Sequence, residues 1–72
     1  MTPLSHRDYD ALEEAILAGR RIAVRRRGTE YVVIPIELRI SGRRETIEAR
    51  NPTTGDLMTI FLDDVDAFDI IA

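Results

Sequence analysis

The apolar residues between positions 9 and 16 recur at the three- and four-residue spacing of an amphipathic helix. The apolar stripe consists of Tyr9, Leu12, Ala15 and Ile16. Most positions between them are acidic, so one face of this helix would be apolar and the other charged. The pattern predicts a helix over about residues 6–18.

The residues at both ends of this stretch are typical of helix caps. Ser5 can accept a hydrogen bond from a backbone N–H of the first turn, and Asp8 completes a short capping box. Leu4 and Tyr9 occupy the two positions of a hydrophobic staple. Gly19 is placed to end the helix, because glycine adopts the left-handed conformation without strain.

After Gly19 the apolar spacing changes from helical to alternating, which is typical of half-buried strands. The predicted strands lie around residues 21–25 and at 31–40, 45–50, 57–62 and 67–71. They are separated by turns at Gly28-Thr29 and Ser41-Gly42, a loop over 51–56 and a 3₁₀ turn at Asp63-Asp64. One helix and five short strands predict a single domain over 1–72, with a small antiparallel barrel over about 21–71.

The longest predicted strand, 31–40, has apolar residues on both faces. Alternation places five of them on one face: Val32, Ile34, Ile36, Leu38 and Ile40. Tyr31 and Val33 belong to the other face, so the half before Pro35 is expected to be covered on both sides. Pro35 cannot donate to a ladder, which predicts an edge, a bulge or a sharp bend. A register shift of one residue there would exchange the two faces.

The composition is that of a small globular protein, with 44% hydrophobic residues among 72. The sequence has no cysteine, which excludes disulfides and thiolate metal sites and fits a reducing compartment. No apolar run approaches the length of a membrane span, and residues 1–19 are too acidic for a signal peptide. We therefore expect a cytoplasmic protein that makes no membrane contact.

Catalytic chemistry has few candidate residues. His6 is the single histidine, and with Ser5 and Asp8 it supplies the residue types of a catalytic triad. Three residues in one opening helical turn cannot build both triad contacts and an oxyanion hole. Because lysine and cysteine are also absent, we predict that the chain is not an enzyme and needs no cofactor.

An acidic cluster near the C-terminus is the candidate for cation binding. It consists of Asp63, Asp64, Asp66 and Asp69. Calcium and magnesium prefer such oxygen ligands, but the cluster lacks the glycine and the bidentate glutamate of an EF-hand loop. Val65 and Phe68 are interleaved as expected core residues. We therefore predict a solvated acidic rim and no metal site.

Charge is distributed unevenly along the chain. All ten basic residues are arginine, and residues 20–44 hold eight of them against two acids. The rest of the chain holds two arginines against eleven acids. The net charge of −3 is thus the sum of +6 in the centre and −9 elsewhere. Such polarity concerns binding partners rather than the fold.

The arginine-rich first strand is a candidate contact for phosphate groups. Alternation places arginines on the face opposite Ile22 and Val24, and hairpin pairing is expected to bring two more near them. The basic set is Arg21, Arg25, Arg27, Arg43 and Arg44, with Tyr31 as the candidate base-stacking side chain. Phe61 and Phe68 are assigned to the core. The alternative is a solvated face that the acidic helix and C-terminus partly neutralise.

Two stretches near the ends of the chain match the motifs of a known family. Residues 8–13 read Asp-Tyr-Asp-x-Leu-Glu, and Ile60–Phe68 is similar to a closing Leu-Asp-x-Ile-x-x-Phe. Both stretches resemble the Rof-like proteins, Rho-binding antiterminators in which such a helix precedes an Sm-like barrel. The resemblance spans about residues 8–68. It implies docking on the transcription termination factor Rho through Asp8, Asp10, Glu13 and Glu14.

Two further motifs match a second family. Pro35 and Leu38 form a Pro-x-x-Leu in the second strand, and Thr54–Asp63 reads Thr-Gly-x-x-x-Thr-x-x-Leu-Asp. These motifs resemble those of WYL-type domains, although the Trp-Tyr-Leu signature is absent from the third strand, Glu45–Ala49. Both resemblances imply one fold: mainly β with one N-terminal α-helix and a small Sm/SH3-like five-stranded antiparallel barrel.

Three binding functions follow as alternatives. The first is a transcription-associated protein that docks on a protein partner, such as Rho, through its acidic helix. The second is contact with RNA or another nucleic acid through the arginine set. The third is a WYL-like barrel that binds a small ligand or self-associates, and its ligand version requires an open pocket. The sequence leaves the oligomeric state open.

Overall fold

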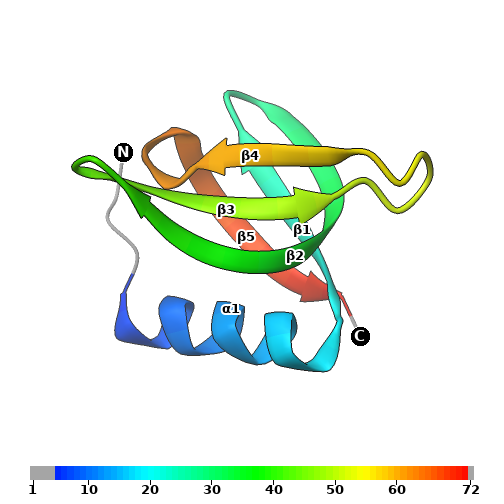
Figure 1. The fold of residues 1–72 in the computed structure, drawn as a ribbon, viewed down its shortest axis with the longest axis horizontal. Helices are drawn as coiled ribbons and strands as arrows, with labels where there is room; N and C mark the ends of the chain where they lie inside the picture. Colours follow the sequence, from blue (N-terminus) through cyan, green and yellow to red (C-terminus); the bar gives the residue numbers. More distant parts are fainter. Residues whose placement is uncertain (1–4, 72) are drawn as a thin grey trace.

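The computed structural model describes residues 5–71 and consists of one helix followed by five strands (Figure 1). The elements are α1 (His6–Ala18), β1 (Arg21–Arg26), β2 (Thr29–Ser41), β3 (Arg44–Arg50), β4 (Leu57–Phe61), the 3₁₀ turn η1 (Leu62–Asp64) and β5 (Val65–Ile71). The predicted helix and 3₁₀ turn are confirmed, and the last strand begins two residues earlier than predicted. The predicted staple involves Leu4, which lies outside the described residues.

Both predicted caps of α1 are confirmed. The Ser5 hydroxyl accepts a hydrogen bond from the Asp8 backbone N–H at 3.2 Å. The Ser5 N–H donates to Oδ2 of Asp8 at 2.9 Å, which completes the capping box. Gly19 ends the helix in the left-handed conformation, with φ of 66°. In this conformation the N–H of Arg20 reaches the Ala15 carbonyl oxygen at 2.9 Å.

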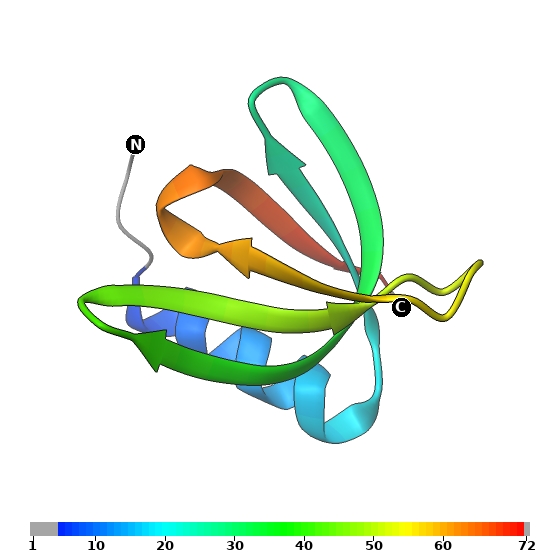
Figure 2. The same ribbon diagram turned by 45° about the horizontal axis from the view of Figure 1, so that its top comes forward.

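The five strands form one antiparallel sheet in the order β4-β3-β2-β1-β5. The edges are β4 and β5, which follow one another in the chain through η1. Figure 2 shows that the sheet curls, with α1 along one side. No ladder joins β4 to β5 within residues 5–71, so the sheet is open. The number and direction of the strands are confirmed, whereas the closed barrel is not.

The bend that curls the sheet lies in the middle of β2, where this strand changes neighbour. Its first half pairs with β1 up to Val33, and its second half pairs with β3 from Ile34 onward. Between Pro35 and Glu37 the register shifts, which leaves Ile36 as the extra residue of a bulge. The bulge is one of the three structures predicted for Pro35, and it is confirmed.

The bulge also corrects the predicted face of β2. Val33 and Pro35 are buried, whereas Val32 is 42% exposed and Ile36 41% exposed. Beyond the bulge the inward position passes to Leu38, which pairs with the buried Ile47. The extra residue inverts the alternation, so the five residues assigned to one face are divided between two.

The core is built from α1 and the inner face of every strand. Its buried residues are Leu12, Ala15, Ile22, Val24, Val33, Ile47, Ala49, Ile60, Leu62 and Val65. Leu12 is 0% exposed, and burial of one such side chain contributes about 1.5–3 kcal/mol. Phe68 is half-buried against the core as predicted, but Phe61 lies on the outer side with Thr46 opposite it. The assignment of Phe61 to the core was therefore wrong.

Two hairpin turns differ by one residue from their predicted positions. The first turn lies one residue earlier in the chain, and the second lies one residue later. The first is Arg27-Gly28, with φ of 51° and 79°, and the second is Gly42-Arg43. Positive φ at both central residues is typical of a type I′ turn, and this applies to the first turn, whose twist matches that of the flanking strands. The predicted loop at 51–56 is confirmed, and the side chain of Asn51 accepts from the backbone N–H of Thr53 at 2.8 Å.

Candidate binding surfaces

The predicted basic set is largely paired with carboxylates. Arg25 lies 3.5 Å from Glu30, and the two residues face each other across the β1–β2 hairpin. Arg27 lies 3.4 Å from Asp64, and its backbone N–H donates to Asp66 at 3.2 Å. The 3₁₀ turn and the start of β5 therefore neutralise the tip of this hairpin.

The structure places the five arginines of this set in separate regions. Arg43 and Arg44 lie at the β2–β3 turn, whereas Arg27 lies at the β1–β2 turn, at the other end of the 13-residue β2 (Figure 1). Arg44 lies 3.2 Å from Asp63, so η1 holds arginines from both hairpin tips. Arg21 lies at the start of β1 beside Ile71. A continuous stripe of arginines would support contact with RNA better than these separate positions do. The RNA contact therefore stays a prediction.

Tyr31, the side chain predicted to stack on an RNA base, is covered by an arginine. Tyr31 is half-buried against the core, and the guanidinium of Arg26 lies 5.2 Å from the centre of its ring. Phe61 has a similar arrangement, with the Arg44 guanidinium 4.0 Å from its ring centre. Such cation–π contacts occupy the ring face on which a base would stack. Neither contact was predicted from the sequence, because each joins residues on two different strands.

The four predicted acidic residues of α1 have two different roles. Asp8 closes the capping box and is half-buried, so its carboxylate is already hydrogen-bonded. Asp10, Glu13 and Glu14 are exposed. None of these three forms an ion pair with another residue between 5 and 71. Contact with a protein partner through these residues stays a prediction.

A hydrogen bond links the N-terminal half of α1 to β3. The Tyr9 hydroxyl donates to Oε1 of Glu45 at 2.7 Å. This bond stabilises the protonated phenol, and burial and the negative charges of Glu45 and Asp63 act in the same direction. Together they raise the pKa of Tyr9 above its ordinary value of 10.0.

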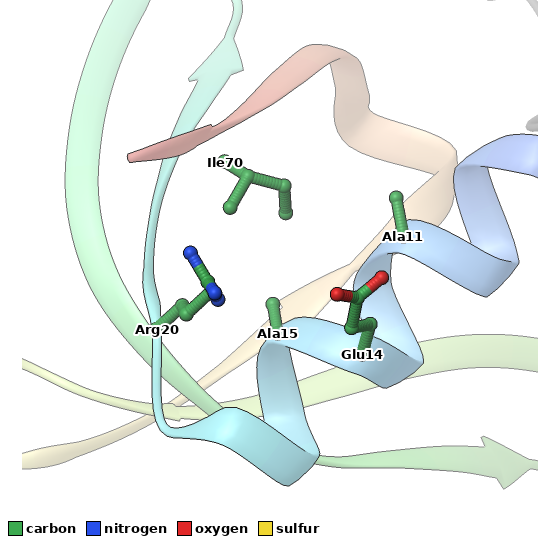
Figure 3. Close-up of a pocket in the computed structure, with 5 residues that line it drawn as sticks. All are labelled: Ala11, Glu14, Ala15, Arg20 and Ile70. Atoms are coloured by element: carbon green, nitrogen blue, oxygen red, sulfur yellow. The ribbon is translucent and has the colours of Figure 1, made fainter. Parts of the chain in front are cut away.

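A hollow of about 260 Å³ lies between α1 and β5, and we call it the polar hollow. It is lined by Ala11, Glu14, Ala15, Arg20 and Ile70. Figure 3 shows the side chains of Arg20 and Glu14 on either side of Ala15, with Ile70 facing them from β5. These two charges form no ion pair within the described chain. The polar hollow therefore has an apolar floor and one charge of each sign at its rim.

A second hollow of about 270 Å³ lies on the other side of α1, against the bulge of β2, and we call it the apolar groove. Its lining consists of Glu13, Ile16, Leu17, Ile36, Glu37 and Leu38. Neither hollow was predicted from the sequence. The one available signal was Leu17, an apolar residue outside the predicted stripe.

Three of the four acidic residues near the C-terminus contact arginines: Asp63 pairs with Arg44, Asp64 pairs with Arg27, and Asp66 accepts from the Arg27 backbone N–H. No group of three or more His, Cys, Asp or Glu side chains in residues 5–71 is arranged to hold a metal ion. In the same residues, no helix has the length and apolar character needed to cross a membrane.

The chain is similar in structure to a much longer protein. No protein-family model and no curated protein matches the sequence. Among solved structures, the proteasome accessory factor B/C (PafBC) of Arthrobacter aurescens matches with a TM-score of 0.77 and 20% sequence identity. The match covers 97% of this chain and 12% of PafBC. PafBC contains a WYL domain of Sm-like fold. The chain thus shares its fold with a small part of a larger protein.

Proposed function

We propose that this chain is a non-catalytic, WYL-like binding domain that takes a small ligand in the polar hollow between α1 and β5. The observation that carries the proposal is the open hollow with Arg20 and Glu14 at its rim. The fold shared with PafBC, together with the WYL-like motifs at Pro35–Leu38 and Thr54–Asp63, supports the choice of this family.

The lining of the polar hollow defines the chemistry of the ligand. Arg20 offers hydrogen-bond donors to a carboxylate, and Glu14 accepts from an ammonium group. Ala11, Ala15 and Ile70 offer an apolar floor to the carbon chain between them. We therefore expect a zwitterion with a short aliphatic chain.

The size of the polar hollow limits the ligand further. Its 260 Å³ correspond to about nine water molecules at about 30 Å³ each, below the 300–1,000 Å³ of sites for drug-sized ligands. A ligand of this size that binds an open site has few contacts. We expect a dissociation constant on the order of 1 mM, which corresponds to about −4 kcal/mol.

The test is an NMR titration of the chain with glycine, β-alanine, γ-aminobutyrate and ε-aminocaproate, a series in which the two charges move apart. We expect one member to shift the backbone amides of Ala11, Ala15, Arg20 and Ile70. Hexanoate and hexylamine each have one charge and should bind more weakly. Arg20→Gln should weaken binding of the tightest-binding member about tenfold. Arg43 is an exposed arginine at the β2–β3 turn, and Arg43→Gln should leave this binding unchanged.

Two results would contradict the proposal. One is the absence of localised shifts with every member of the series at concentrations of tens of millimolar. The other is equal binding to wild type and to Arg20→Gln, which would show that the charge of Arg20 has no part in recognition.

The second candidate function is the Rof-like one, docking on Rho through the acidic face of α1. It is favoured by the exposure of Asp10, Glu13 and Glu14, which have no ion-pair partner within residues 5–71. Capture of the host's Rho by the immobilised chain at low salt tests it, with the triple variant Asp10→Asn/Glu13→Gln/Glu14→Gln as the control. Failure to retain Rho at low salt would remove this candidate.

A further inference from the structure

Two apolar side chains on neighbouring elements lie outside the core of this small domain. Leu17, in the last turn of α1, is 89% exposed, and Ile36, at the bulge of β2, is 41% exposed. Single exposed apolar residues are common on protein surfaces and need no explanation. These two line one depression, the apolar groove, and are therefore contiguous.

The groove exists because of the bulge. Ile36 is the residue that β2 gains between Pro35 and Glu37, so it is excluded from the ladder with β3. Leu38, two residues on, already points to the core. The helix runs beside this part of β2 (Figures 1 and 2), and its residues Ile16 and Leu17 belong to the lining of the groove.

The rim of the groove is acidic. Glu13 lies one helical turn before Leu17 and has no ion-pair partner within residues 5–71. Glu37 lies on the β2 side and accepts a hydrogen bond from Arg39 at 2.8 Å. The residues of α1 from 6 to 18 include four acids against one arginine, so the helix that borders the groove carries net negative charge.

We propose that the apolar groove is the docking site for a segment of a partner protein that presents one large apolar side chain flanked by lysine or arginine. The apolar side chain would enter between Leu17 and Ile36, and the basic residues would face Glu13 and Glu37. Charge at the rim selects the partner and speeds its approach, whereas the apolar contact supplies the affinity.

A second copy of this chain is a poorer occupant of the groove. A symmetric dimer joins the same patch on both subunits. Groove-to-groove contact would therefore bring Glu13 of each copy, which has no ion-pair partner within residues 5–71, close to the glutamates of the other rim, and like charges at an interface are unfavourable. The acidic rim thus favours a basic partner over self-association at this surface.

This inference extends the second candidate function, because Glu13 belongs to both surfaces, and it is separate from the polar hollow. The test does not use Rho, so the two can fail independently. Its probe is a peptide with two central leucines and two lysines at each end, titrated into the chain and followed by backbone amide shifts. A peptide with glutamates in place of the lysines is the charge control.

We expect the lysine peptide to shift Leu17, Ile36 and Leu38, and the glutamate peptide to have no localised effect. Leu17→Ser should weaken binding of the lysine peptide about tenfold, and Glu13→Gln should weaken it about threefold. Leu57→Ser is the matched control, since Leu57 is also exposed, at 64%, but lies on the edge strand β4 away from the groove. The Leu57→Ser variant should bind the lysine peptide as tightly as the wild type does.

Three results would overturn the inference. The first is equal binding of both peptides, and the second is a loss of affinity with Leu57→Ser that is as large as with Leu17→Ser. The third is concentration-dependent dimerisation that Leu17→Ser abolishes, measured by analytical ultracentrifugation, which would assign the groove to a second copy. Because Leu17 is almost fully exposed, Leu17→Ser is expected to fold normally, and a circular dichroism spectrum checks this.

Discussion

The helix α1 has a hollow on each side, and the two are nearly equal in volume but different in chemistry. The polar hollow, toward β5, measures about 260 Å³ and has Arg20 and Glu14 at its rim. The apolar groove, toward β2, measures about 270 Å³ and is walled by Leu17 and Ile36. A straight helix that packs on a curved sheet leaves such spaces on both flanks, so the side chains decide what each can bind.

The difference lies in the side chains that the helix directs to each flank. Toward β5 it presents Ala11 and Ala15, which are too small to fill the space, so charged side chains define the hollow. Toward β2 it presents Ile16 and Leu17, so the groove is defined by apolar surface. Binding to the polar hollow should therefore decrease strongly with salt, and binding to the groove should retain an apolar part that salt does not screen.

The largest effect is expected for Leu12→Ala, which removes the anchor that both hollows share. Leu12 is 0% exposed, and large-to-small changes at such positions cost about 2–5 kcal/mol. We expect the free energy of unfolding to fall by about 3 kcal/mol and binding to both hollows to weaken together. Urea denaturation measures the change. Leu57→Ala, at an exposed position, is the control, and an equal loss there would contradict the account of the core.

Gly19→Ala should lower the stability and disturb the side of α1 that borders the polar hollow. Gly19 has φ of 66°, and a Cβ added there would meet nothing within 4 Å, so the cost arises from the backbone alone. An L-residue in this conformation costs about 1 kcal/mol, measurable by urea denaturation. Since Gly19 directs the chain into Arg20, we expect amide shifts at Arg20 and Ile70 but not at Ile36. Shifts of equal size at Ile36 would show that the two sides are coupled.

Tyr9→Phe should affect the opposite side, because Tyr9 lies on the same helix face as Glu13 and Ile16. The variant loses the hydrogen bond to Glu45, an exposed contact worth about 0.5 kcal/mol. Amide shifts should therefore be larger at Ile36 than at Ile70.

The same residue predicts a pH dependence in the wild type. The pKa of Tyr9 is raised in the folded state, so its contribution to stability is complete below pH 10.0, the ordinary value. The contribution is lost as the pH rises through the folded-state pKa. Ultraviolet titration of the tyrosines should show Tyr9 ionising above pH 10.0, and Glu45→Gln should bring its pKa down. A Tyr9 that ionises at pH 10.0 or below would argue against the hydrogen bond.

The smallest effect on stability is expected for Arg20→Gln and Leu17→Ser, both at exposed positions. Each should change the free energy of unfolding by less than about 0.5 kcal/mol. Each should also weaken binding at its own hollow only, Arg20→Gln for the zwitterion and Leu17→Ser for the lysine peptide. Binding of both probes should be measured on both variants. A variant that weakens the binding of both the zwitterion and the lysine peptide would show that the two sites are not independent.

Local patterns in the sequence determined the helix, its caps and the strands. The Ser5–Asp8 capping box and the ending at Gly19 depend on residues within a few positions of one another, so a single stretch of sequence contains the whole cause. The same holds for the loop at 51–56 and the strand alternation from Ile22 to Val24. Pro35 also predicted a break in β2, because the missing N–H is a property of one residue.

The tertiary structure alone decided which faces of these elements remain open. The direction of the bulge after Pro35 exposed Ile36 and turned Leu38 inward, and that choice depends on pairing with β3 rather than on β2 itself. One arginine from each hairpin, Arg44 and Arg27, is paired with Asp63 or Asp64 because η1 folds back between the tips, across 19 and 37 positions of sequence. Long-range contacts of this kind set the charge and the shape of the surface, and they leave no periodic signal in the sequence.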